Sequence, residues 1–245
     1  MRWSRQILFG DVDAMFASAA VLADPSLAGK PVAVGGSSPR GIIAAASYAA
    51  RAFGVHSAMP TGEATRLCPQ LILIPPDRPL YRRLHEQMQA VTDQLFPLTE
   101  WSSIDEFYAD TTQLQTRHPD PLSLGQLVKD ALYDATGLRC TIAVATGKTV
   151  AKIAADSHKP DGLVMVPPGT EEAFLAPRPL RAMPGIGPKT AARLEPLGLK
   201  TIGDLLDQRW DQPLRHIFGT RLHWVRELAR GIDHEPVVAD RESKS

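Results

Sequence analysis

The pattern of apolar and polar residues changes at the pair Pro167-Pro168. Before this point, short apolar runs typical of buried strands alternate with segments of helical periodicity, which favours a mixed α/β domain. One of these helices is expected to begin with Ser123 as its N-cap. After this point the chain offers three or four short helices and no convincing strand. A chain of 245 residues, 44% of them hydrophobic, is long enough to bury a core in both parts.

Charge and cysteine content exclude several classes of protein. Lysine plus arginine and aspartate plus glutamate both total 27, so the formal net charge is zero and no global basic excess indicates a polyanionic partner. Cys68 and Cys140 are too few and too far apart for a cysteine-ligated metal site, and they suit a reducing compartment. No apolar run approaches the roughly 20 residues that span a bilayer. We expect a soluble, cytoplasmic protein.

Two acidic segments stand out against apolar surroundings. Asp11-Val12-Asp13 closes the apolar run 7–10, and Asp105-Glu106 lies inside the apolar pattern of 103–110. Carboxylates at the ends of core strands are costly to desolvate, and like charges brought together need a cation. Oxygen ligands favour Mg²⁺, and two such ions in one cleft can hold a reacting phosphate. Judged by spacing alone, ordinary surface acids at strand ends are the commoner explanation.

Two glycine-rich segments partly resemble phosphate-binding loops. Gly147-Lys148-Thr149 resembles the end of a P-loop, but Ile142 occupies the place of the required first glycine. The segment 183–191 lacks the third glycine of a dinucleotide fingerprint, because Thr190 stands there. It does form a glycine hairpin that starts a helix, and such a turn exposes N–H groups to phosphate oxygens. We interpret it as a contact to a nucleic-acid backbone, rather than a tight turn between packed helices, through Gly185, Gly187 and Lys189.

Five stretches, in this order, resemble the successive motifs of Y-family DNA polymerases, closest to the DNA polymerase IV type. They are Asp11 to Ser18, Ser47 to Pro60, Ser103 to Glu106, Ala151 to Asp156 with Lys159-Pro160, and the helix-hairpin-helix of Pro184 to Ala191. The resemblance runs from about Leu8 to Glu242. It implies an α/β fold class: an α+β palm with a mixed sheet, fingers, and a small all-α helix-hairpin-helix thumb.

The resemblance also implies domain boundaries. The palm would comprise residues 1–13 and 77–166, the fingers 14–76 and the thumb 167–231. Residues 232–245 would be a linker towards a little-finger domain that the 245 residues do not include. The chain would then be a catalytic core whose binding to DNA is weak and salt-sensitive.

The activity implied by the resemblance is template-directed DNA synthesis of low fidelity, including synthesis past lesions. A nucleotide would pass from a dNTP to a primer 3′-hydroxyl by a two-metal mechanism. Asp11, Asp105 and Glu106 would be the catalytic residues and, with the Val12 carbonyl, would hold two Mg²⁺ ions, for which Mn²⁺ can substitute. Asp13 belongs to the same motif, but the role implied for it there is structural rather than metal binding.

Residues from several motifs would contact the incoming nucleotide. Tyr48, Arg51 and Lys159 would donate to the triphosphate. Phe16 would lie under the sugar as a steric gate against a 2′-hydroxyl. The roof over the nascent base pair would consist of Ile42, Ala44 and Ala58.

The sequence departs from the family pattern at two places that bear on nucleotide affinity. Ala45 stands where a threonine or serine is common, and Gly147 stands where an asparagine is usual. The expected partners are primer–template DNA and dNTP, with no membrane. A sliding clamp would join only in a longer protein, because no clamp motif lies in these residues. The protein is expected to be a monomer, and nucleoid-associated if bacterial.

Two alternatives stay open at this level. A non-catalytic polymerase-like scaffold in DNA damage tolerance would share the fold, although its mark would be lost acids. A helix-hairpin-helix DNA glycosylase would use Lys189 and Asp207, but this leaves everything before Val166 unexplained.

Overall fold

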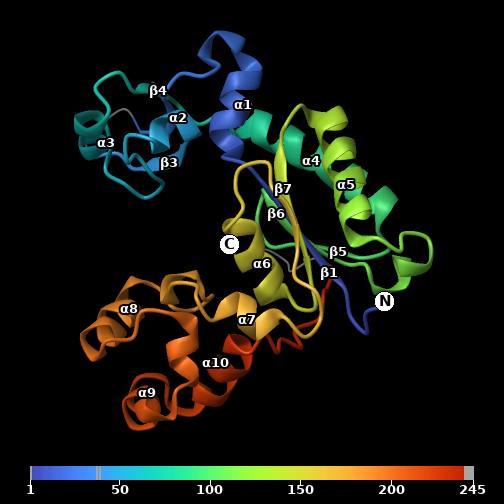
Figure 1. Cartoon of the computed structure of the whole chain (residues 1–245). Coiled ribbons are helices and arrows are strands. Elements are labelled where there is room, and N and C mark those ends of the chain that lie inside the picture. Colours follow the sequence, from blue (N-terminus) through green and yellow to red (C-terminus); the bar gives the residue numbers. More distant parts are fainter. Residues whose placement is uncertain (1, 37, 39, 240–245) are drawn as a thin grey trace.

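A mixed five-stranded sheet forms the centre of the molecule in a computed structural model that describes residues 2–36, 38 and 40–239 (Figure 1). The strand order is β5-β6-β1-β7-β8, and only the β7–β8 pair is parallel. The strands are β1 (Ile7–Val12), β5 (Thr99–Trp101), β6 (Glu106–Asp110), β7 (Cys140–Ala145) and β8 (Leu163–Met165). β1 and β7 are buried along their whole length, which explains their near-continuous apolar sequence.

Helices cover both faces of this sheet. On one face, α4 (Arg78–Leu95) and α5 (Pro121–Thr136) pack over a core that includes Leu8 and Phe107. On the other face, α6 (Lys148–Asp156) packs over Ile7 and Phe9. Since strand side chains alternate, Asp11 shares the α6 face with Ile7 and Phe9.

The predicted start of α5 was wrong by three residues. The helix begins at Pro121, and the Asp120 carboxylate accepts hydrogen bonds from the N–H groups of Leu122 and Ser123. Aspartate competes well with serine as an N-cap, and proline is favoured at the first helical position, so Asp120-Pro121 is the stronger start signal.

A second, three-stranded sheet is built from the residues between β1 and α4. Its order is β3-β2-β4, with β2 (Val32–Gly35), β3 (Ile43–Ala46) and β4 (Ile72–Ile74). Its helices are α1 (Met15–Ala23), α2 (Tyr48–Arg51) and α3 (Thr61–Leu67). A small core of its own, which includes Ala33, Ile43 and Val55, holds this unit together.

The part after Pro167-Pro168 is helical, as predicted. Its α-helices are α7 (Glu171–Leu175), α8 (Pro188–Leu194), α9 (Asp211–Phe218) and α10 (Leu222–Ala229). Among its described residues the β pairing is limited to a single bridge between Pro179 and Thr201. The 3₁₀ turns found in the described ranges are Pro25–Leu27, Thr112–Thr116, Leu180–Ala182, Glu195–Leu197, Ile202–Leu206, Gln208–Trp210 and Gly219–Arg221. The predicted fold class, a mixed-sheet α/β part with a small all-α part, is confirmed.

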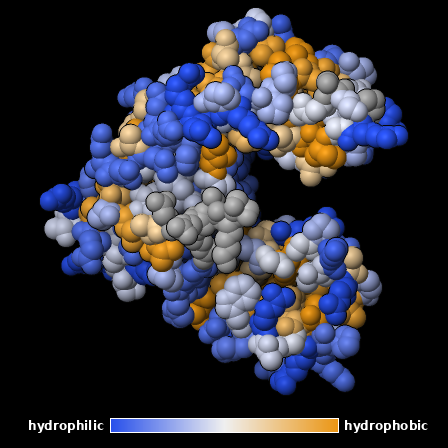
Figure 2. Space-filling view, turned by 180° about the vertical axis from the view of Figure 1, so that it is seen from behind, coloured by the Kyte–Doolittle hydropathy of each residue, from blue (hydrophilic) through white to orange (hydrophobic). Residues whose placement is uncertain are grey.

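Figure 2 shows a wide hollow between the three-stranded unit and the helical part, with the five-stranded sheet domain joining them. No helix in the described ranges combines the length and the apolar character that crossing a membrane requires.

The segment that follows α10 folds back onto the five-stranded sheet domain. Val238 donates its N–H to the Glu100 carboxylate at 2.9 Å, and Arg5 donates to the carbonyls of Asp233 and Glu235. Under it, the buried Lys148 ammonium lies 2.5 Å from Glu100 Oε2. Residues 232–239 of the expected linker are therefore docked against the sheet domain, and 240–245 lie outside the described residues.

The core leaves no room for a side chain at Gly10 of β1. A Cβ there would overlap the ring of the buried Phe107 and lie 2.9 Å from Ile142 Cδ1. We expect Gly10→Ala to lower the free energy of unfolding by about 1–3 kcal/mol, the usual cost of overpacking a core. Urea unfolding measures this. Gly187→Ala is the matched control, because a Cβ there meets nothing within 4 Å. Equal stability of the two variants would contradict this packing.

Candidate active site

The register of β1 and β6 brings the two acidic segments together. The two strands pair antiparallel with Asp11 directly opposite Glu106, so both side chains leave the sheet on the same face. The Val12 N–H donates to the Asp105 carbonyl at 3.0 Å, which holds the turn before β6 against the end of β1. All three predicted catalytic acids therefore lie at one end of the sheet, beside α6.

Two of these acids are paired with lysines. Lys152, on α6, donates to Glu106 Oε1 at 2.5 Å, and its ammonium lies 5.0 Å from the centre of the Phe9 ring. Lys159, just after α6, donates to Asp11 Oδ2. The Asp105 carboxylate accepts a 2.5 Å hydrogen bond from the Ser103 hydroxyl. Sequence reasoning assigned a role to Lys159 but none to Lys152, whose signals were its place in the fourth motif and the local excess of basic residues over 137–160.

Burial raises the pKa of the Asp11 carboxyl from its ordinary 3.8 to about 7. The ion pair with Lys159 opposes this rise, whereas the negative charges of Glu106 and Asp105 add to it. Burial lowers the pKa of Lys152, but its bond to Glu106 and the nearby acids outweigh burial, so the pKa stands above its usual value. Burial of negative charge at the end of β1 is therefore unfavourable, and a nearby cation would reduce this cost.

The donor set fits a hard divalent cation. Carboxylate oxygens from Asp11, Asp105 and Glu106 are the ligand type that Mg²⁺ prefers, and the raised pKa of Asp11 marks an electrostatic need that a cation would meet. No three acidic, histidine or cysteine side chains among the described residues, however, are arranged to hold a metal ion together. A metal ion at Asp11 would have to compete with Lys159 for the same carboxylate.

Tyr48 and Arg51 come from α2, which Ser47 caps by accepting the Ala50 N–H. The Tyr48 hydroxyl donates to Asp13 Oδ1 at 3.4 Å, and burial together with the Asp13 charge raises the Tyr48 pKa to about 12. The phenol therefore stays protonated and can donate. The Arg51 guanidinium lies over the Tyr48 ring, 4.7 Å from its centre.

Phe16 stacks on a tyrosine that sequence reasoning missed. The rings of Phe16 and Tyr81 are 4.2 Å apart between centroids and nearly parallel, at 19°. Tyr81 lies in the first turns of α4, and its only sequence signal was an aromatic residue at helical spacing. This stack joins α1 to α4 and supports the Phe16 ring from one side.

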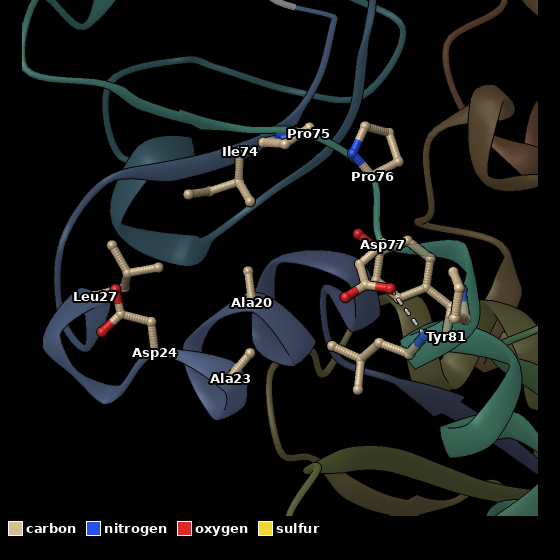
Figure 3. Close-up of a pocket in the computed structure, with 11 residues that line it drawn as sticks. Ala20, Ala23, Asp24, Leu27, Ile74, Pro75, Pro76, Asp77 and Tyr81 are labelled. Carbon is tan, nitrogen blue, oxygen red and sulfur yellow. Dashed lines mark hydrogen bonds between the residues drawn. The ribbon is translucent and has the colours of Figure 1, made fainter.

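A cavity of about 460 Å³ adjoins this stack, between α1, the end of β4 and the start of α4 (Figure 3). Its wall is mainly apolar, and Tyr81 forms part of it. The Asp24 and Asp77 carboxylates at its edge are engaged as helix caps, to Ser26 and Leu80. None of the predicted catalytic or substrate residues lines this cavity.

The predicted roof residues lie on the exposed side of β3 and its neighbouring turn. Ile42 is 52% exposed, whereas Ile43 and Ala45 are buried. Ala44 is exposed, and so is Ala58, which has a positive φ of 68°. All three predicted roof side chains are thus exposed, whereas Ala45 is buried.

The predicted DNA-binding hairpin lies in the helical part, whereas the three acids lie on the five-stranded sheet domain. Ile186 is buried and anchors the hairpin, while Gly185, Gly187 and Lys189 are exposed. Gly185 has a φ of 86°, which favours glycine, and Gly187 precedes α8. The turn therefore presents backbone N–H groups at an open surface.

The structure explains why position 147 is glycine, where the family pattern has asparagine. Gly147 is the N-cap residue of α6, and it has no side chain with which to cap. Asp233 does so instead: its carboxylate accepts the Thr149 N–H at 2.8 Å across 84 residues. A Cβ at Gly147 would lie 2.9 Å from the Asp233 Cβ, so the docked segment needs glycine at this position.

Known protein families match two stretches of the chain. The model of the impB/mucB/samB family matches residues 10–156, and that of the IMS family HHH motif matches residues 168–199. The chain is 43% identical over 247 residues to the DNA polymerase IV of Halorhodospira halophila and 42% identical over 247 residues to that of Streptomyces coelicolor. These matches cover 100% of the chain but 68% and 52% of the two relatives. The chain therefore spans between about half and two thirds of their length.

Solved structures resemble the chain closely. An insertion ternary complex of Dbh DNA polymerase is 31% identical, with a TM-score of 0.85 over 95% of this chain and 69% of that one. DinB from Sulfolobus solfataricus is also 31% identical, with a TM-score of 0.86 and the same coverage of both chains.

The raised pKa of Asp11 predicts a stability penalty with a defined pH dependence. Between about 3.8 and 7 the folded state binds more protons than the unfolded state, so stability falls as the pH rises through this window. We expect Asp11→Asn, without added metal, to raise the thermal midpoint at pH 8, and to change it little near pH 4, where the carboxyl is mostly protonated in the folded protein. Calorimetry at both pH values measures this. A midpoint lowered equally at both would contradict it.

Proposed function

The chain belongs to the impB/mucB/samB family of Y-family DNA polymerases, and we propose that it catalyses template-directed transfer of a nucleotide from dNTP to a primer 3′-hydroxyl. We further propose a two-metal mechanism of low fidelity that can copy past lesions. The observation that carries the proposal is the register of β1 and β6, in which Asp11 faces Glu106 and the Asp105 turn is bonded to Val12.

Asp11, Asp105 and Glu106, with the Val12 carbonyl, would hold two Mg²⁺ ions. Bound there, Mg²⁺ would activate the primer hydroxyl and neutralise charge on the phosphates. Binding the triphosphate and orienting the acids would fall to side chains of the protein. Once Asp11 no longer needs Lys159 as its counter-charge, the Lys159 ammonium is free to donate to a triphosphate oxygen, and Lys152 keeps Glu106 oriented from the α6 side.

The remaining substrate contacts follow from side chains beside the acids. The protonated Tyr48 hydroxyl and the Arg51 guanidinium are donors suited to the triphosphate. Phe16, backed by Tyr81, would stand against the sugar and exclude a 2′-hydroxyl. A roof of Ile42 with the small Ala44 and Ala58 would tolerate distorted base pairs.

The duplex would occupy the hollow between the fingers, residues 14–76, and the thumb, residues 167–231 (Figure 2). Gly185, Gly187 and Lys189 would contact its backbone, which favours affinity without sequence preference. Residues 1–13 and 77–166 would form the palm. A monomer acting in the cytoplasm on nucleoid DNA, with a sliding clamp as partner of a longer form, is consistent with this function.

Removing the acids tests the catalytic assignment. We expect Asp105→Ala with Glu106→Ala to reduce single-nucleotide incorporation on a primer–template with Mg²⁺ by roughly 10³-fold or more, because preorganised charge at the reacting phosphate is lost. Asp93→Ala, an exposed acid on α4, is the matched control. Normal incorporation by the double variant would refute the assignment, and no incorporation by the wild-type chain would favour the non-catalytic scaffold.

The steric gate is tested by sugar selection. Phe16→Ala removes the ring that stacks on Tyr81, so ribonucleotide incorporation relative to deoxyribonucleotide should rise on the order of tenfold or more. Phe53→Ala, an exposed aromatic of the same unit, should leave selection unchanged. Paired kinetics with dNTP and rNTP measure the ratio. Unaltered selection in the Phe16 variant would remove this residue from the gate.

A further inference from the structure

Lys129 is a buried lysine for which the proposed reaction has no use. It lies on α5, and its side chain is only 10% exposed. Its ammonium donates to the backbone carbonyls of Cys140 at 2.9 Å, Asp161 at 2.6 Å and Gly162 at 3.0 Å, and to Asp161 Oδ1 at 2.8 Å. Burying an ammonium is costly, so this set of oxygens must offset a substantial desolvation penalty.

The turn that Lys129 holds combines a residue in an uncommon backbone conformation with a position that only glycine fits. Asp161 adopts a φ of 55°, in the left-handed region that side chains other than glycine seldom occupy. At Gly162, an added Cβ would overlap the carbonyl oxygen of His158. Such conformations persist where the surroundings over-determine them, and they cluster at functional sites.

The turn is held from its other side as well. The buried Asp13 accepts the Asp161 N–H through Oδ2 at 2.7 Å, and accepts the Thr141 hydroxyl through Oδ1 at 2.9 Å. The Thr141 hydroxyl in turn accepts the Gly162 N–H at 3.2 Å. Both N–H groups and both carbonyls of residues 161–162 are therefore bonded, by partners on β7, α5 and the end of β1.

This fixed turn follows directly after Lys159, whose ammonium reaches Asp11. We propose that Lys129, Asp13 and Asp161 form a clamp that positions Lys159 for the triphosphate of the incoming nucleotide. The inference rests on the proposed function. The three residues are positioning residues: they act on the backbone of the turn that follows Lys159. Asp13 also accepts the Tyr48 hydroxyl at 3.4 Å, but Lys129 contacts neither of these side chains, so a change at Lys129 reaches the nucleotide through the turn and Lys159.

Arg139, a second cation beside Asp161, serves as a control for the charge at this turn. Arg139 Nη1 lies 3.1 Å from the other Asp161 oxygen, but its side chain is 61% exposed. Exposed ion pairs contribute little, so Arg139→Gln removes a charge beside the same carboxylate without opening the clamp.

The test is steady-state incorporation of one nucleotide by the full 245-residue chain on a primer–template with Mg²⁺. We expect Lys129→Met to raise KM for dNTP roughly tenfold, the scale of one weakened charge-assisted hydrogen bond, with kcat within about twofold. Asp161→Asn, which keeps the N–H and tolerates the left-handed turn, should raise KM less. Arg139→Gln should leave both constants unchanged.

A double variant separates positioning from general damage. Because the clamp acts through Lys159, Lys129→Met combined with Lys159→Met should have the same KM as Lys159→Met alone. Effects of the two changes that multiply would overturn the proposal, as would an unchanged KM in a folded Lys129→Met protein. If Lys129→Met does not fold, Asp161→Asn with and without Lys159→Met decides by the same criteria.

Direct nucleotide binding separates this proposal from the proposed function. The dissociation constant of a fluorescent dNTP, titrated with primer–template and Ca²⁺, should rise in Lys129→Met and not in Arg139→Gln. If the wild-type chain binds dNTP without incorporating it, the proposed function fails and the clamp is decided by these constants. If it neither binds nor incorporates dNTP, both are overturned.

Discussion

The carboxylate of Asp11 is buried beside Glu106, and like charges in a poorly solvated site repel each other unless cations lie close by. Much of the neighbouring architecture supplies such cations. Helix α6 brings Lys152 to Glu106, and the turn after it brings Lys159 to Asp11. Both lysines contact the acids directly, so the fold itself places positive charge beside them. This is electrostatic preorganisation, built from one strand end and one helix.

The position of α6 depends on distant parts of the chain. At its start, Asp233 supplies the cap that Gly147 cannot, and the buried pair of Lys148 and Glu100 anchors the first turn. Beyond its end, the clamp of Lys129, Asp13 and Asp161 fixes the turn that follows Lys159. The helix that carries the positive charge is thus secured at both ends. The segment after the helical part takes part in this, since Val238 donates to the same Glu100 carboxylate.

Much of the fold and part of the site could be predicted from local patterns. The change to helices after Pro167-Pro168, the buried strands and the two acidic segments are visible in the sequence, because each depends on a short stretch of residues. The cap at Thr149 and the Lys129 clamp could not be predicted, because their partners are 84 and 32 residues apart and nothing in a lysine's sequence neighbourhood says which carbonyls it will meet. Ser123 failed as a cap because a stronger signal preceded it.

The central claim is that Asp11, Asp105 and Glu106 hold divalent cations beneath an incoming nucleotide. The most direct measurement is Mn²⁺ binding by electron paramagnetic resonance, titrated into the protein with a dideoxy-terminated primer–template and dNTP. Our account predicts that more than one Mn²⁺ binds per complex in the wild-type chain, and that replacing Asp105 and Glu106 together by alanine removes this protein-dependent binding. Equal Mn²⁺ occupancy in the two proteins would contradict it.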